Sequence, residues 1–483
     1  MARVRGQYGI TRGTGVGLRK DALTFVDVMT SGLANMGPAM SLFFSTAFLV
    51  GTLGQVVPFE IVLALLAILT LGNTLSEFSR KIPSSGSFIT FVGRTFGVKF
   101  ATASALTLVV GYIIAISGVI AVLGGWTQTV IERYTGFTVP WIPIMLMGVL
   151  VIAILTVRGI KIAAAWAVFL FAFEAVMLLV LAVVILFTTK LSVAPFNPSH
   201  ASQGWKGLAL GFPLVIFLFV GWENSAALAE ETQNPRKNVP RAIYTGIVVI
   251  ALLYIMCSYS AMIGYGLSPD KLSALANDSG PFDTLGQKYL GPLRLLLDLA
   301  GFSSIFATII AAANSQTRIL YNAGREGFLP RVFGVVGRRY QTPHVALLTY
   351  LVLATLIAIV FGYKSGPSDV FGWMSTLGTI PLTAMYAVSN IALPVYYYRH
   401  HRHEFHWLRH GVIPVLGVLL LVWPFWGLVQ PGQEFPYNLF PWIFLALVVA
   451  SILWTLYLFS GNRGKSLDLS SIEVFDHGAR EET

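Results

Sequence analysis

The chain has 483 residues, of which 55% are hydrophobic and only 11% carry a charge, and its mean hydropathy is +0.72. This composition excludes a soluble protein with a large core and predicts an all-helical, polytopic membrane protein. The first 20 residues are polar and basic, so no cleaved signal peptide is expected. The single cysteine, Cys257, excludes an internal disulfide and a cysteine metal cluster, and we expect no metal and no cofactor.

Apolar runs of about 20 residues, the length of a helix that crosses a bilayer, occur along the whole chain. They predict twelve spans, at residues 22–50, 57–77, 100–126, 140–157, 162–188, 207–232, 241–265, 292–320, 343–362, 369–398, 411–430 and 437–460.

Lysine and arginine residues concentrate in every second connecting segment. If the spans alternate, all but seven of the 32 lie on the side of the N-terminus. The seven exceptions are Arg133, Lys190, Lys206, Lys271, Lys288, Arg294 and Lys364. Because positively charged loops stay in the cytoplasm, both termini are predicted to be cytoplasmic. The net charge of +10 then reflects topology and contact with anionic lipid headgroups, and no nucleic-acid partner is expected.

Two loop segments resemble each other. Residues 85–97 read SGSFITFVGRTFG and residues 279–291 read SGPFDTLGQKYLG, with five of thirteen positions identical. One copy follows the second span and the other follows the seventh, so they fall on opposite sides of the membrane. Unless the similarity is due to chance, this placement predicts two five-span repeats of opposite orientation. The predicted organisation is an N-terminal segment (1–21), a first repeat (22–190), a second repeat (191–400), two additional spans (401–460) and a cytoplasmic tail (461–483).

The first and sixth spans, which correspond in such a repeat, are both interrupted. Span one contains Asn35, Gly37 and Pro38 at mid-length, and span six contains Gly221 and Glu223. Proline lacks an amide hydrogen and clashes with the preceding turn of a helix. Polar backbone groups freed at bilayer depth are tolerated only where they line a cavity or bind a ligand. Two interrupted spans in corresponding positions predict a site at the midplane, and kinks that serve packing alone are the alternative.

The chemistry of the two breaks favours one class of ligand. The free amides of a half-helix that begins near Ala39 suit a carboxylate, and the freed carbonyl groups of both breaks suit an ammonium group. An amino acid carries both groups and fits this pair of breaks better than a sugar.

The segment around the second break resembles a known signature. Residues 219–223 read FVGWE, and they are followed by Glu230, Glu231 and the sequence NPRKNVPRA at 234–242. This pattern looks like the sixth-span signature of the amino acid, polyamine and organocation transporter superfamily. Further positions that resemble the family are Pro83, Gly86, Phe88, Gly97, Asn314, Arg318, Arg325, Gly327, Leu329 and Pro330. The resemblance covers most of the chain and implies the LeuT-like fold, with broken helices 1 and 6.

The resemblance also implies a substrate site between the two breaks. The residues expected to contact the substrate are Asn35, Gly37, Pro38, Ala39, Met40, Ser41, Phe217, Val220, Gly221 and Trp222. Phe217 matches the position of an aromatic gate that closes over the substrate in relatives. The chain departs from the family at Gly37-Pro38-Ala39, where many members have Gly-Ser-Gly. One amide donor is therefore missing, and the amides of Ala39, Met40 and Ser41 are expected to serve.

Glu174 is the most informative ionisable residue, because a carboxylate in mid-span is costly. It aligns with a fifth-span lysine of many family members, so the sign of the charge is reversed. Such a group can bind and release a proton during a transport cycle, hold sodium or a cationic substrate, or make a structural hydrogen bond. Ser303 and Ser304 align with hydroxyl ligands of sodium-coupled relatives, or bond carbonyl groups of their own helix. Glu223 is either a second proton site or a structural acceptor.

A membrane enzyme and a channel are the two other functional classes that a polytopic chain allows. All eight histidines lie in loops, at span ends or in the tail, and no HExxH or paired-aspartate motif occurs, so a membrane enzyme is not expected. A channel is harder to exclude from sequence. Five of the histidines cluster at residues 400–410, where they bind metal, sense pH or contact lipid headgroups.

These observations predict a secondary active transporter of the cytoplasmic membrane that takes up a neutral amino acid with protons by alternating access. A neutral substrate is favoured by the nearby apolar residues Met36, Met40, Phe43, Phe44, Phe217 and Trp222. The alternatives are a permease or exchanger of amines, polyamines or cationic amino acids, and a sodium symporter. The sequence does not indicate an oligomeric state.

Overall fold

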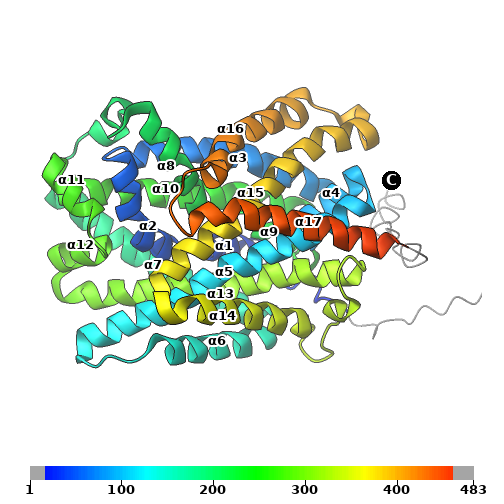
Figure 1. Ribbon diagram of the computed structural model, residues 1–483, viewed down its shortest axis with the longest axis horizontal. Coiled ribbons are helices and arrows are strands. Elements are labelled where there is room, and N and C mark those ends of the chain that lie inside the picture. The colour runs from blue at the N-terminus through cyan, green and yellow to red at the C-terminus, as the bar shows by residue number, and fades with distance from the viewer. Residues whose placement is uncertain (1–16, 461–483) are drawn as a thin grey trace, which may run out of the picture.

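The computed structural model describes residues 17–460, and its regular elements are helices (Figure 1). The α-helices in chain order are α1 Phe25–Met36, α2 Pro38–Leu53, α3 Val57–Lys81, α4 Phe88–Phe96, α5 Val98–Thr135, α6 Trp141–Val157, α7 Ile160–Thr188, α8 Gly204–Leu218, α9 Asn224–Ala227, α10 Pro235–Tyr265, α11 Pro269–Ala276, α12 Pro281–Leu290, α13 Arg294–Arg325, α14 His344–Ser365, α15 Pro367–His400, α16 Ile413–Val429 and α17 Phe440–Phe459. The predicted tail (461–483) and most of the predicted N-terminal segment lie outside the described residues.

Each predicted span coincides with one helix or with a pair of helices. Within residues 17–460, ten helical stretches are long and apolar enough to cross a membrane, and α6 and α8 are shorter apolar helices of 17 and 15 residues. The predicted all-helical, polytopic architecture is therefore confirmed, whereas the number of twelve crossings stays a prediction.

The first predicted break lies at the junction of α1 and α2. Gly37 has φ 53° and ψ 66°, in the left-handed region that favours glycine. A Cβ atom there would lie 2.3 Å from Oγ1 of Thr308 on α13, so no larger residue fits. Pro38 begins α2, a position where the missing amide hydrogen has no partner within the helix. Glycine therefore makes the turn, and proline starts the second half-helix.

The second break follows α8, which ends at Leu218. The chain then turns through Gly221, whose φ is 114°, before the short helix α9 begins at Asn224. A Cβ atom on Gly221 would lie 2.2 Å from Nδ2 of Asn35. The two breaks, almost 200 residues apart in the chain, are therefore in direct contact.

Short helices lie at both ends of the bundle. Figure 1 shows α4 at the right and α11 and α12 at the left. We call the end that holds α4 and the end of α17 the terminal end, and the end that holds α11 and α12 the far end. Because α4 and α12 belong to the two copies of the repeated segment, their opposite positions agree with an inverted repeat. The domain boundaries stay a prediction.

Helices α5 and α15 pack closely because α5 presents glycines to its partner. A Cβ atom on Gly111 would lie 2.6 Å from Pro381, and one on Gly118 would lie 3.0 Å from Phe371. Small residues allow helices to approach closely inside a membrane. This contact holds α15 beside the second break, where the rings of Tyr386 and Trp222 lie 5.6 Å apart.

The contact between the breaks gives a test of the fold. Gly221→Ala combines a strained backbone with a clash against Asn35, so we expect it to destabilise the protein by on the order of 2 kcal/mol or more. Gly246→Ala, in the middle of α10 with open space around it, is the matched control and should unfold like the wild type. Thermal unfolding in detergent checks both, and equal midpoints for the two variants would contradict the described break.

Candidate functional site

The amides at the start of α2 already have partners within the protein. The amide of Ala39 donates to Oε2 of Glu174 on α7 (3.1 Å), and the amide of Met40 donates to Oγ of Ser304 on α13 (3.0 Å). The amide of Ser41 donates to the carbonyl of Gly37 (2.7 Å). The position predicted to hold a substrate carboxylate is therefore occupied by the carboxyl group of Glu174.

The carbonyl groups freed by the breaks are also partly satisfied. The hydroxyl of Tyr254 donates to the carbonyl groups of Met36 (3.2 Å) and Leu218 (2.8 Å), one at each break. Ser41 also donates to Met36 (2.8 Å), and Thr308 donates to Ala34 (3.0 Å). Side chains of α2, α10 and α13 thus replace the helical hydrogen bonds that the breaks remove.

Several buried polar atoms remain without a hydrogen-bond partner among the described residues, and at the second break they include Nε1 of Trp222 and the side-chain amide of Asn224. Two acceptors beside the first break are also among them: Oδ1 of Asn35, and Oε1 of Glu174, whose side chain is fully buried. A buried polar atom without a partner is costly, so it marks a place where a ligand, water or proton binds. Both atoms belong to residues that contact the breaks.

The second break is closed by Glu223. Its Oε2 accepts from the amide of Gly221 (3.0 Å), and its Oε1 accepts from the hydroxyl of Tyr112 on α5 (3.0 Å). Glu223 is buried at 1% exposure. Its two hydrogen bonds are those of a structural acceptor.

Aromatic side chains cover the far-end side of the breaks. Half-buried Phe217 lies 6.3 Å from Phe371, and Phe371 lies 5.4 Å from Phe44. Trp126 contacts both Phe43 (5.4 Å) and Phe44 (5.8 Å). The predicted gate residue is thus one member of an aromatic cluster drawn from α2, α5, α8 and α15.

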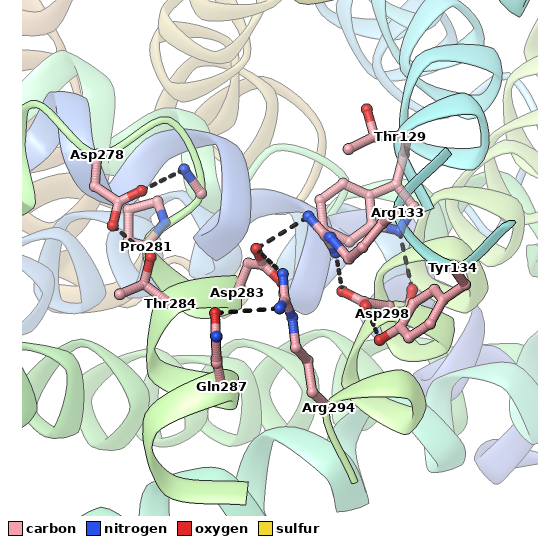
Figure 2. A network of polar contacts seen from close by, with 12 residues as sticks. Thr129, Arg133, Tyr134, Asp278, Pro281, Asp283, Thr284, Gln287, Arg294 and Asp298 are labelled. Carbon is pink, nitrogen blue, oxygen red and sulfur yellow. Dashed lines mark hydrogen bonds and ion pairs between the residues drawn. The ribbon is translucent and has the colours of Figure 1, made fainter. Parts of the chain in front are cut away.

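Charged residues form a network of ion pairs and hydrogen bonds at the far end (Figure 2). Arg133 of α5 bridges Asp283 of α12 (3.0 Å) and Asp298 of α13 (2.9 Å). Arg294 donates to Asp283 (2.6 Å), and Tyr134 donates to Asp298 (2.7 Å). On its apolar side, α12 packs through Phe282 against Phe43, with ring centres 5.2 Å apart. The helix α12 is therefore held over the end of α2 by ion pairs and by aromatic contact.

A second set of ion pairs closes the terminal end, just after the second break. Glu231 pairs with Arg318 of α13, and both side chains are only 1% exposed. Glu230 accepts two hydrogen bonds of 2.8 Å from Arg325 and one of 3.1 Å from the amide of Ser85. Both ends of the region around the breaks are thus closed.

An apolar groove of about 330 Å³ lies elsewhere, between α5 and α14. It is lined by Val110, Ile113, Ile114, Leu353, Leu356, Ile357, Val360 and Phe361. None of these residues belongs to the breaks, and several are exposed on the flank of the bundle. The groove therefore does not belong to the candidate site.

The structure brings most of the predicted site residues together. Asn35, Gly37, Ala39 and Met40 contact residues of the second break, of α7 or of α13, as described above. Ser303 donates to the carbonyl of Leu170 on α7 (2.9 Å), one turn before Glu174, and not to its own helix. Pro38, Val220 and Trp222 lie within or beside the two breaks.

Sequence reasoning missed Tyr254, Thr308, Tyr112, Trp126 and Phe371. None of the five lies within the sequence patterns described above, and only the packing of their helices brings them to the breaks. The histidine cluster is divided: His403 and His406 are exposed, whereas His410 is buried. Among residues 17–460, no group of three or more metal-binding side chains is present.

The comparisons with known proteins agree with this geometry. A family model described as amino acid permease matches residues 23–452. The branched-chain amino acid permease of Bacillus subtilis (strain 168) is 24% identical over 365 residues, which cover 71% of this chain and 74% of the relative. The methylthioribose transporter of the same strain is 25% identical over 440 residues, 86% and 87% of the two chains. The low-affinity putrescine importer of Escherichia coli (strain K12) is 26% identical over 360 residues, 72% and 76%.

The broken helices and the apolar bundle define a multi-pass membrane transporter, and not an enzyme. More particularly, the chain belongs to the amino acid permease family of the amino acid, polyamine and organocation superfamily. The resemblance inferred from residues 219–242 is therefore confirmed.

The buried pair at the terminal end yields a second prediction. Arg318→Met leaves Glu231 buried without its cation, and we expect a loss of about 3–5 kcal/mol in the free energy of unfolding. Adding Glu231→Gln should restore much of that loss, because no uncompensated charge remains. Arg325→Met, at a half-exposed pair, should cost clearly less. Denaturant unfolding of the four proteins checks this order, and a double variant less stable than Arg318→Met would contradict it.

Proposed function

We propose that this permease takes up neutral amino acids together with protons, by alternating access, across the cytoplasmic membrane. One observation carries the proposal: the carboxyl group of Glu174 accepts the hydrogen bond from Ala39 that a substrate carboxylate would need. The clustering of lysine and arginine supports a cytoplasmic location for the terminal end.

The shared amide links substrate binding to a proton. Two carboxylates cannot occupy the start of α2 together, because like charges at this distance repel strongly away from water. Protonation removes the charge of Glu174 and weakens it as an acceptor, so the amide of Ala39 becomes available to the substrate. Substrate and proton then bind together. After release of both, ionised Glu174 returns to the amide.

The surroundings of the breaks support a substrate with an apolar side chain. Met36, Met40 and the aromatic cluster lie beside the amide of Ala39. Two relatives are named as branched-chain amino acid permeases, and branched-chain amino acids have apolar side chains. The substrate ammonium group would face carbonyl groups of the breaks and Oδ1 of Asn35, which lacks a partner among the described residues.

The two sets of ion pairs support alternating access. The far-end network holds α12 over α2, and the terminal-end pairs hold the segment after the second break against α13. A substrate between the breaks reaches either side only after one set separates. Transport therefore requires that the sets open in turn.

One observation favours an amine as a second candidate. Glu174 supplies a negative charge at the site, and a substrate without a carboxylate would not compete for the amide. A putrescine importer is among the relatives. In this case ionised Glu174 would bind the amine, and its neutralisation would abolish binding rather than support it.

Replacement of Glu174 separates these candidates. In Glu174→Gln the side chain keeps its shape and resembles the protonated carboxyl group. If Glu174 binds the coupling proton, wild-type uptake should fall by up to about tenfold per unit of rising external pH, once the group is ionised. Exchange by the variant should vary by less than about twofold across that range and should not move protons. Labelled leucine in proteoliposomes gives the measurement.

Glu60→Gln is the matched control for this experiment. Glu60 is also buried in a span, on α3, but it makes no hydrogen bond to the breaks in the described structure. It should retain the wild-type pH dependence. A Glu174→Gln protein that keeps normal proton uptake would refute the proposed coupling.

The substrate class has its own test. A thermal-shift screen of the twenty amino acids and of common amines should give the largest stabilisation with branched-chain amino acids, and Glu174→Gln should preserve it. Stabilisation by putrescine alone, lost in Glu174→Gln, would instead support the amine candidate. The physical basis is that a ligand stabilises the folded state according to its affinity.

A further inference from the structure

Glu77, His410 and Tyr397 form a buried cluster at the terminal end, away from the breaks. Nε2 of His410 lies 3.2 Å from Oε2 of Glu77, and the hydroxyl of Tyr397 donates to the same oxygen over 3.3 Å. The rings of Tyr397 and His410 stack with centres 3.6 Å apart. None of the three residues exceeds 7% exposure. The cluster joins α3, α15 and the start of α16, three elements far apart in the chain.

The contacts define which nitrogen of His410 carries hydrogen. The backbone amide of His406 donates to Nδ1 of His410 (2.9 Å), so Nδ1 must be an unprotonated acceptor. Nε2 therefore carries the hydrogen and donates it to Glu77. The described structure thus requires the neutral form of His410, with both ring nitrogens in use.

The hydrogen bond from the amide of His406 to Nδ1 of His410 helps to hold the turn that contains His410. Residues Leu408–Val412 form one turn of π-helix, a wider and less stable turn than an α-helix that is often found at functional sites. The carbonyl of Arg409 in this turn accepts from the side chain of Asn73 on α3 (2.7 Å). The link between His406 and His410 therefore also positions a contact to α3.

Charged and titratable groups around His410 come from all the elements that pack against it. On α3 these are Glu77 and Arg80, which lie 3.7 Å apart. The connecting segment and the π-helical turn contribute Glu404, His406 and Arg409, and α15 and α10 contribute the hydroxyl groups of Tyr397 and Tyr244.

The charge of Glu404 is fixed by its own partner. The pKa of Glu404 lies below its ordinary value because Lys81 donates hydrogen bonds of 2.6 and 2.8 Å to it. Glu404 therefore stays ionised while a histidine titrates.

We propose that His410 is a proton sensor: when neutral it holds the turn between His406 and His410 by accepting the amide hydrogen of His406, and when protonated it releases that amide and loosens the turn. A proton on Nδ1 would face the amide hydrogen of His406, so two donors would confront each other and the hydrogen bond would be lost. The new positive charge attracts Glu77, but Glu77 already accepts the hydrogen of Nε2 and lies beside Arg80. The change therefore falls on the turn between His406 and His410. This sensing does not depend on which substrate the protein carries or on Glu174.

Hydrogen exchange tests the proposal on the full chain in nanodiscs. After correction for intrinsic exchange, amides at residues 404–412 should exchange on the order of fivefold faster at about pH 5.5 than at about pH 8, the equivalent of one lost hydrogen bond. His410→Phe keeps a ring to stack on Tyr397 but cannot titrate, so its corrected exchange at these amides should not change with pH. His403→Phe, an exposed histidine in the same connection, is the matched control and should behave like the wild type.

A second measurement uses the wild-type protein, so it does not depend on the folding of a variant. Nitrogen chemical shifts of labelled histidine give the measurement, because the signal of His410 is the one that His410→Phe lacks. That signal should show a hydrogen on Nε2 at high pH and double protonation as the pH falls. The proposal is overturned if residues 404–412 exchange with the same pH dependence in His410→Phe and wild type, or if His410 carries its neutral hydrogen on Nδ1.

Discussion

Polar backbone groups inside a bilayer must have partners, and the two broken helices depend on this constraint. The breaks remove helical hydrogen bonds at Gly37 and around Gly221, and side chains from other spans replace them. Tyr254 serves a carbonyl group of each break, Thr308 and Ser304 serve the first, and Glu223 serves the second. Glu174 completes the set at the amide of Ala39. These partners are hydroxyl and carboxyl groups, which can move to a ligand or accept a proton, so the same bonds that stabilise the breaks make them a site.

Closure at the two ends rests on different physical interactions. The terminal end is closed by a pair of fully buried charges, Glu231 and Arg318, whose separation leaves each without compensation. The far end is closed by Arg133, Arg294 and Asp283, which are partly exposed, by the buried Asp298 that pairs with Arg133, and by stacked rings beneath them. Partly exposed ion pairs are weaker and are screened by salt. Starting from the described arrangement, we therefore expect that opening the far end requires less free energy than opening the terminal end.

Sequence reasoning predicted the architecture well and the site in part. The spans follow from hydropathy, and Gly37, Pro38 and Gly221 revealed both breaks because few other residues make such turns in a bilayer. Glu174 was singled out by its cost in mid-span, but its partner, the amide of Ala39, was assigned to the substrate. No local signal could connect two groups that lie 135 residues apart. Tyr254, Trp126 and Phe371 were missed for the same reason: an apolar or aromatic residue in a span looks alike whether it faces lipid or a site. His410 is positioned by a π-helical turn, and no sequence pattern predicts that turn.

The central claim is that Glu174 and the carboxylate of the substrate use the same amide and that a proton allows the exchange. Proton uptake on binding tests it most directly, with a pH indicator in weakly buffered detergent solution and the amino acid that gives the largest thermal shift. The account predicts that binding to the wild type takes up protons when Glu174 is initially ionised, and that binding to Glu174→Gln takes up none. Binding without proton uptake by the wild type, or equal uptake by both proteins, would contradict it.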